Sequence, residues 1–351
     1  MYLLMIQQLD VENFTVFKKA AFEFGSQLNV FIGENGTGKT QILKLIYAVV
    51  SMFSKSQELN QPVELMDGSK EAESFKAIFK IDSIMDLVNT DSKQQSLPKK
   101  RAYVSIKCDK HSDLEIVLQD DKNHANTSFQ DKKDFLHNSS ALYLPVHELL
   151  TIYPNYQSLS KMYQLPYDST VDDAIARLGL PYKKETPKEY DEIVKVLENA
   201  IDGKIFLKNE KFYFSHENRE MDVNMAAEGW RKLGMVLQLL KNGGLGKGMV
   251  LLWDEPEANL NPKLIRLIAK VIVELSHLEI QTFITTHSLF LLREIDMLVK
   301  SDKKIKNGDV RYFNFPKKGV VEQGSSPEEL GDILLLDESL AQSDRFMAME
   351  D

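Results

Sequence analysis

The sequence lacks the features that mark secreted and membrane-bound proteins. It has a single cysteine, Cys108, in 351 residues, so no disulfide can form within the chain. No apolar run approaches the ~18 to 20 residues that a membrane helix needs, and Asp10 and Glu12 interrupt the N-terminal region where a signal peptide would need an apolar core. These absences predict a cytoplasmic protein without a membrane partner.

Excess positive charge is also missing. The formal net charge is −9, which argues against a broad groove for non-specific DNA binding. Two short basic runs, PKKR (98–101) and KSDKKIK (300–306), leave local contacts with phosphate open, although solvated turns are their ordinary interpretation. Nucleic acid therefore stays an open partner.

What is present is the pattern of an α/β protein. Apolar residues make up 43% of the chain, an ordinary fraction for a globular protein. Three short strands open the chain; the third, ending at Ile32, leads into a glycine-rich loop and then into a helix with an apolar stripe from Ile42 to Val50. The C-terminal third alternates strands and helices, which predicts a largely parallel sheet flanked by helices.

The middle of the chain is less regular. Strands are expected at SFKAIFKID (74–82), RAYVSIKCD (101–109) and LEIVLQD (114–120), which predicts an antiparallel elaboration over 54–138. Residues 155–202 read as a helical insertion, and a hairpin is expected around KNEK (208–211). The end of the chain, 323–351, is an acidic tail.

The glycine-rich loop, GENGTGKT (33–40), fits the phosphate-binding pattern G-x-x-x-x-G-K-[ST] between a strand and a helix. Its glycines let backbone N–H groups converge on phosphate, Lys39 reaches the β- and γ-phosphates, and Thr40 offers a hydroxyl to Mg²⁺. ATP and Mg²⁺ are the expected cofactors. Nucleotide contacts are expected from Gly33, Glu34, Asn35, Gly36, Thr37, Gly38, Lys39, Thr40 and Gln41.

Two further strands end in residues suited to ATP hydrolysis. MVLLWDEPE (249–257) delivers Asp254, which would hold Mg²⁺, and Glu255, which could polarise the attacking water. FITTHS (283–288) ends in His287, whose imidazole can sense or hold a γ-phosphate. Glu255, Lys39 and His287 are therefore the candidate catalytic residues.

Taken together, the loop near the N-terminus, LLWDEPEANLNP (251–262) and TTHS (285–288) resemble the ABC-type ATPase heads of the RecF, SMC and OLD group. The resemblance implies a P-loop NTPase fold of ABC-ATPase type: a mixed sheet flanked by helices, an antiparallel N-terminal sheet and a helical insertion. It also implies an ATP-dependent homodimer, closed head to head around ATP, or a higher even oligomer. In that assembly the turn 258–262 with Asn259 faces a second subunit, and His287 is the switch histidine.

The resemblance implies two further elements. MAAEGWRKLG (225–234) is the best match to the signature turn; it keeps Gly229, but Ala227 stands where the family often has serine, so Arg231 or Lys232 would compensate. LYLPVHELL (142–150) corresponds to the lid segment without its glutamine, which leaves His147 and Glu148 as candidates to sense the metal. The expected metal ligands are Thr40, Asp254 and Glu148.

On this basis the chain divides into a discontinuous ATPase head (1–53, 139–154 and 203–322), the elaboration 54–138, the helical insertion 155–202 and the tail 323–351. The leading hypothesis is an ATPase similar to the ATPase subunits of the anti-phage systems Septu or PARIS, which acts as a sensor for a separate effector or toxin and hydrolyses ATP at a rate that the altered signature turn leaves open. The alternatives are a RecF-like ATPase of DNA repair and a nearly static ATP-bound scaffold that holds a toxin.

Overall fold

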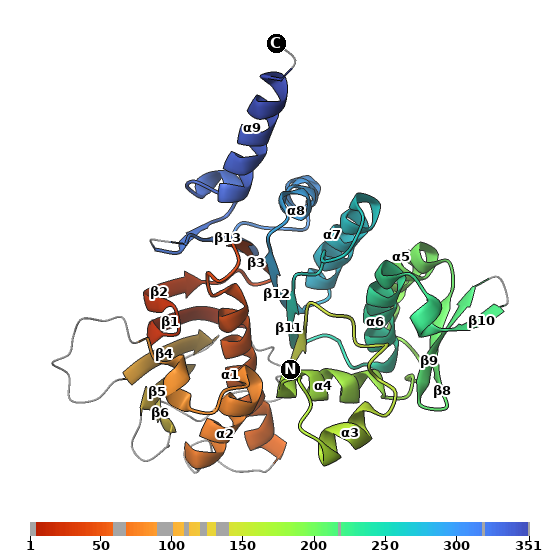
Figure 1. The fold of residues 1–351 in the computed structure, drawn as a ribbon, viewed down its shortest axis with the longest axis horizontal. Helices are drawn as coiled ribbons and strands as arrows, with labels where there is room; N and C mark the ends of the chain where they lie inside the picture. Colours follow the sequence, from red (N-terminus) through yellow and green to blue (C-terminus); the bar gives the residue numbers. More distant parts are fainter. Residues whose placement is uncertain are drawn as a thin grey trace.

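The computed structural model describes residues 5–58, 68–89, 101–108, 112–119, 125–130, 140–216, 219–317 and 320–349. The strands in this part of the chain form three sheets, and helices lie on both sides of the largest one (Figure 1). Within the described ranges, no helix is long and apolar enough to cross a membrane.

A six-stranded sheet forms the centre of the molecule. Its order is β14-β13-β3-β12-β11-β7, and neighbouring strands are parallel except for β13 and β14. The strands are Leu28–Gly33 (β3), Ser140–Leu144 (β7), Met249–Asp254 (β11), Gln281–Thr286 (β12), Val310–Phe315 (β13) and Glu322–Gly324 (β14). Because adjacent parallel strands end at the same edge of a sheet, the ends of β3, β12 and β11 meet there.

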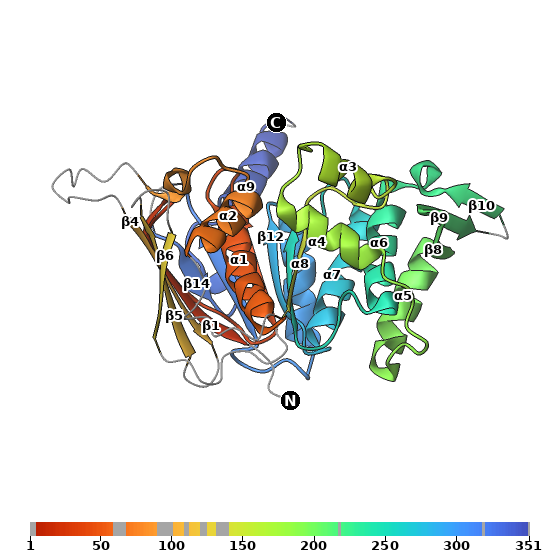
Figure 2. The same ribbon diagram turned by 90° about the horizontal axis from the view of Figure 1, so that it is seen from below.

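A second, antiparallel sheet of five strands, in the order β2-β1-β4-β5-β6, stands beside the centre (Figure 2). Its strands are Ile6–Phe14 (β1), Phe17–Glu23 (β2), Arg101–Cys108 (β4), Ser112–Gln119 (β5) and Ala125–Gln130 (β6). Helices Lys39–Glu58 (α1) and Gly68–Phe79 (α2) share one apolar cluster with this sheet and with one face of the central sheet. Phe31 of β3 points into that cluster.

The opposite face of the central sheet carries a second apolar cluster. Val30 and Ile32, which flank Phe31 in β3, point into it, as the period of two in a strand requires. The helices on this side are Tyr156–Met162 (α3), Ser169–Leu178 (α4), Asp191–Ile201 (α5), Glu228–Asn242 (α6), Pro262–Ser276 (α7) and Leu289–Ser301 (α8). A small third sheet, β10-β9-β8, lies at their outer edge (Figure 1). It consists of Lys204–Lys208 (β8), Lys211–His216 (β9) and Arg219–Asp222 (β10).

The predicted fold class is confirmed: the molecule is an α/β P-loop fold with a mixed, helix-flanked sheet and an antiparallel sheet. The hairpin around KNEK is also present, with Asn209 and Glu210 at φ of 51° and 58° in its turn. The predicted strand at 74–82 is wrong. Its residues 74–79 belong to α2, because Ala72 and Phe75 recur at a helical interval and both are buried.

The predicted domain boundaries stay a prediction. α1 continues without a break across 53/54, and 155–202 contains α3, α4 and α5. The acidic tail contains most of β14 and ends in the helix Leu334–Met347 (α9), which projects from the body (Figure 1). Short 3₁₀ helices occur at Ile84–Leu87, Lys188–Tyr190, Val223–Met225 and Pro327–Glu329.

Candidate nucleotide-binding site

The glycine-rich loop links the end of β3 to the first turn of α1. Gly36 and Gly38 have φ of 78° and 97°, in the region that favours glycine. At Gly38 a Cβ atom would also lie 2.5 Å from the ring of Phe17, so the position excludes side chains by space as well as by backbone conformation. The loop therefore wraps tightly in front of the N-terminus of α1, where backbone N–H groups and the helix dipole favour an anion.

Lys39 lies within this loop and is buried, 6% exposed. Its ammonium donates to the carbonyl oxygens of Gly33 and Glu34, each at 2.7 Å. Burial lowers the pKa of Lys39, although the carboxylates of Glu255 and Asp254 oppose that shift. The loop thus holds a cation at its centre, in electrostatic contact with the last residue of β11, Asp254, and with Glu255 directly after it.

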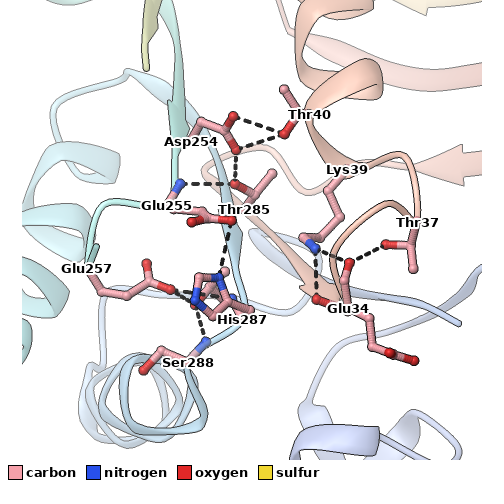
Figure 3. Close-up of polar contacts among 12 residues, drawn as sticks. Glu34, Thr37, Lys39, Thr40, Asp254, Glu255, Glu257, Thr285, His287 and Ser288 are labelled. Atoms are coloured by element: carbon pink, nitrogen blue, oxygen red, sulfur yellow. Dashed lines mark hydrogen bonds and ion pairs between the residues drawn. The ribbon is translucent and has the colours of Figure 1, made fainter. Parts of the chain in front are cut away.

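Asp254, the last residue of β11, is the meeting point of three strands and α1. The hydroxyl of Thr40 donates to its Oδ2 at 2.9 Å, and the hydroxyl of Tyr143 in β7 donates to the same atom at 2.9 Å. Thr285 of β12 donates to Oδ1 (Figure 3). The structure therefore brings together the predicted metal ligands Thr40 and Asp254, and it adds Tyr143 and Thr285, which the sequence analysis missed.

Glu255 and His287 follow the ends of neighbouring strands and lie side by side. Nδ1 of His287 is 3.2 Å from Oε1 of Glu255, and the Glu255 backbone N–H donates to Thr285 Oγ1 at 3.0 Å (Figure 3). Glu255 has φ of 45°, which is uncommon for a residue with a side chain and is found at functional sites. The structure therefore places these two candidate catalytic residues in contact at one edge of the sheet, and their catalytic roles stay a prediction.

Glu257 is a further carboxyl at this edge, and the sequence analysis passed over it. It is 5% exposed and accepts at Oε1 from Thr286 Oγ1 at 2.5 Å and from the backbone N–H of His287 at 3.3 Å. Burial raises the pKa of Glu257. The carboxyl therefore fixes the backbone that carries His287. Glu257 is the second glutamate of the motif DEPE, so the sequence shows the residue. Only the fold shows that its carboxyl faces the end of β12.

The predicted signature turn opens α6. Gly229 packs against α7 so closely that a Cβ atom would lie 2.3 Å from Leu264. Asn259 has φ of 62° and donates to Glu228 Oε1 at 2.9 Å, while the buried ammonium of Lys232 donates to the Ala258 carbonyl at 2.9 Å. Burial lowers the pKa of Lys232. These contacts fasten the turn 258–262 to the start of α6, next to Ala227, its N-terminal flanking residue.

Arg231 points to the lid segment. Its Nε lies 3.0 Å from Glu148 Oε1, and its Nη1 donates to the Ala226 carbonyl at 2.7 Å. Glu148 also accepts from Thr151 Oγ1 at 2.6 Å and from the Leu150 N–H at 2.9 Å. The expected metal ligands Thr40 and Asp254 contact each other, whereas the contacts found for Glu148 are with Arg231, Thr151 and Leu150. The metal roles of Glu148 and of its neighbour His147 stay a prediction.

The donor set fits Mg²⁺. No group of three or more histidine, cysteine or acidic residues that could hold a metal occurs in the part of the chain that the structure describes. A hydroxyl and one carboxylate, 2.9 Å apart in Thr40 and Asp254, nevertheless suit a hard cation that binds through one or two carboxylates and takes further oxygens from phosphate and water. Such a site is complete only with a nucleotide.

Comparison with known proteins points the same way. The family model described as "AAA domain, putative AbiEii toxin, Type IV TA system" matches residues 28–293. The chain is similar to the DNA replication and repair protein RecF of Shouchella clausii (strain KSM-K16), with 35% identity over 63 residues, 18% of this chain and 16% of the relative. It is also similar to RecF of Clostridioides difficile (strain 630), with 32% identity over 92 residues, 25% of this chain and 24% of the relative. The similarity thus spans a quarter or less of these curated relatives.

Solved structures share the fold. The SMC head domain from Thermotoga maritima is 12% identical with a TM-score of 0.51, covering 92% of this chain and 98% of that one. An SMC head bound to the C-winged helix domain of ScpA is 16% identical with a TM-score of 0.55, covering 92% and 98%. At such identities the likeness establishes the arrangement of the elements.

Proposed function

From its membership of this AAA-domain family, as an ABC-type ATPase of the RecF and SMC group, we propose a function for the chain. It hydrolyses ATP and thereby controls a separate effector protein. The observation that carries the proposal is the contact of Thr40 with Asp254 beside the contact of Glu255 with His287, at the edge where β3, β12 and β11 end. In the proposed mechanism these residues would supply the phosphate loop, the metal carboxylate, the general base and the γ-phosphate contact of one site.

The charges at this edge explain why ATP would bind together with a cation. Lys39 is in electrostatic contact with the four carboxylates of Glu255, Asp254, Glu257 and Glu34. A polyphosphate entering the loop would meet more negative than positive side-chain charge. Thr40 and Asp254 would hold Mg²⁺, which supplies charge neutralisation at the β- and γ-phosphates. Lys39 would exchange the loop carbonyls of Gly33 and Glu34 for phosphate oxygens.

Glu255 is the proposed general base. Its backbone N–H is fixed by Thr285 and its carboxylate by His287, so the side chain is oriented before substrate binds. A carboxylate so placed can accept a proton from the attacking water, and His287 can then donate to the γ-phosphate. Glu257 would keep His287 in position through the backbone contact.

The signature turn supports a site shared by two subunits. Ala227, Gly229, Arg231 and Asn259 are proposed to meet the ATP held by a second copy, so that two heads close on two nucleotides. In this structure Arg231 is paired with Glu148, so replacing the missing serine hydroxyl would require Arg231 to leave that pair. This requirement is consistent with slow hydrolysis.

A role in anti-phage defence or a toxin–antitoxin-like system is the proposed biological setting, with this chain as the sensor in the cytoplasm. The description of the family, which names an AbiEii toxin and a type IV toxin–antitoxin system, supports it. The partner would then be an effector or toxin that is held or released according to the nucleotide state.

The similarity to RecF favours a second candidate, an ATPase of DNA repair. DNA binding would have to overcome the net charge of −9. Of the two basic runs, 98–100 lies outside the described residues, and Lys300 in the other is paired with Asp296 and Glu328. A third candidate is a static scaffold that binds ATP tightly without turning it over.

A purification of two variants, together with DNA-binding and ATPase assays, separates the three candidate functions. Glu255→Gln protein, isolated from its native host in Mg²⁺ and ATP, should carry a second protein in fixed proportion, and Lys39→Ala protein should not. ATP-dependent, salt-sensitive binding to DNA with no second protein would favour the repair role instead. Tight ATP binding by the wild type with turnover no higher than that of Lys39→Ala would favour the scaffold.

A further inference from the structure

α9 is an amphipathic helix that points away from the rest of the molecule (Figure 1). Leu336, Leu340 and Met347 are separated by four and seven residues, so they form one stripe along the helix. Leu336 packs on the core, whereas Leu340 and Met347 are 63% and 58% exposed. An apolar stripe that continues from the core into solvent indicates a contact made with another surface.

The base of α9 is held firmly. Leu330 and Ile333 are buried, Asn314 Nδ2 donates to the Asp332 carbonyl at 3.1 Å, and the Gly331 N–H donates to a carboxylate oxygen of Glu322 at 3.0 Å. These contacts fix the residues that lead into α9, and a swing of the helix onto another part of its own chain would pull Leu336 off the core. The stripe is therefore presented outward in a fixed direction.

A groove of matching character lies between α5, α7 and α8. It has a volume of about 600 Å³ and an apolar floor. A smaller hollow of about 280 Å³ shares Lys270 and Leu298 with it and extends it along α7 to Glu274. From Lys263 to Glu274 the groove follows α7 for about 16 Å, room for some three turns of a docked helix. The floor consists of Val196, Leu264, Leu267 and Leu298.

The rim of the groove carries three basic residues of α7 and one acidic residue of α8, Glu294. Lys263, Arg266 and Lys270 are exposed and follow one side of α7, and no ion pair involves them among the contacts of the described residues. The α9 segment is acidic: residues 334–351 contain five acidic residues and one basic residue. The helix and the groove are thus complementary. Asp337 and Asp344 follow one side of the apolar stripe, and the three basic residues follow the groove on α7.

We propose that α9 of one copy docks in this groove of a second copy. Each chain carries one α9 and one groove. Two copies form a closed dimer when each docks its α9 in the groove of the other, and a larger assembly forms when docking runs in one direction from copy to copy. The contact does not involve the ATP loop, so it goes beyond the proposed function. It persists without nucleotide and in Lys39→Ala protein, where head closure around ATP is abolished.

Sedimentation velocity of the full chain over a range of concentrations, without nucleotide, tests this. The wild type is expected to self-associate, more weakly at high salt. Two charge-reversed proteins, a groove variant and a helix variant, should each lose at least tenfold in affinity. The groove variant is Lys263→Glu, Arg266→Glu and Lys270→Glu; the helix variant is Asp337→Lys, Glu338→Lys and Asp344→Lys.

A mixture of the two variants is the decisive test. The acidic helix of the groove variant then meets the basic groove of the helix variant, and the basic helix of the helix variant meets the acidic groove of the groove variant. The mixture should recover association to within about threefold of wild type. The matched control, Lys18→Glu, Lys19→Glu and Lys107→Glu on the antiparallel sheet, makes the same charge change and should associate as wild type. A monomeric wild type, variants that associate normally, or a mixture that stays monomeric would each overturn the proposal.

Discussion

Removal of one hydroxyl, in Tyr143→Phe, tests how Asp254 is supported. Tyr143 is 2% exposed and its hydroxyl donates to Asp254 Oδ2 at 2.9 Å. Burial raises the pKa of Tyr143, so the phenol stays protonated and donates. A hydrogen bond to a charged group contributes about 1.5 to 3 kcal/mol, and Thr40 and Thr285 remain as donors after the change. We therefore expect a loss of about 2 kcal/mol in the free energy of unfolding.

Two variants calibrate this value. Tyr312 is fully buried, and its hydroxyl has no hydrogen-bond partner among the described residues, so Tyr312→Phe should keep or raise stability. Asp254→Asn leaves one oxygen for three hydroxyl donors, so it should cost about 2 to 4 kcal/mol and also abolish Mg²⁺-dependent nucleotide binding.

Urea unfolding and titration with nucleotide and Mg²⁺ give the two readouts. Tyr143→Phe should lose stability but keep nucleotide affinity within about threefold, because it removes a support and no ligand. The reasoning is refuted if Tyr143→Phe is as stable as wild type, or if Tyr312→Phe loses as much stability as Tyr143→Phe.

Three further changes have defined outcomes. Gly38→Ala places a methyl against Phe17 at φ of 97°, so nucleotide affinity should fall at least about tenfold in a binding titration. The pKa of Glu257 is raised above 4.5 in the folded protein, so the folded state binds the proton more tightly than the unfolded state. The free energy of unfolding of the wild type should therefore fall, relative to that of Glu257→Gln, as the pH rises above about 4.5. Unfolding curves recorded at several pH values measure this. Glu148→Ala removes the carboxylate that pairs with the mostly buried Arg231, so the free energy of unfolding should fall by about 2 to 3 kcal/mol. Urea unfolding measures this, and an unchanged free energy of unfolding would refute a stabilising role for the pair.

The local parts of the site could be read from the sequence. The loop 33–40, Asp254 with Glu255, and His287 each follow directly on an apolar strand, and the ends of parallel strands meet at one edge. That rule places these residues at one edge, and the strand order β3-β12-β11 then decides that Thr40 touches Asp254 and that Glu255 touches His287.

The supporting residues could not be read in this way, because they depend on strand order and on packing. Tyr143 reaches Asp254 because β7 pairs with β11, a strand that lies more than a hundred residues later in the chain. Arg231 and Glu148 were each predicted to face nucleotide or metal, yet in the structure their opposite charges pair with each other. The strand predicted at 74–82 failed because a short apolar run is ambiguous between strand and helix without its neighbours.

The central claim is that Glu255 activates water at an assembled ATP site. Single-turnover hydrolysis and ATP binding, measured side by side for wild type, Glu255→Gln and Lys39→Ala, test it directly. Glu255→Gln should bind ATP as wild type but hydrolyse it about 10²-fold more slowly or worse, and Lys39→Ala should lose binding. Hydrolysis by Glu255→Gln at the wild-type rate would contradict the account.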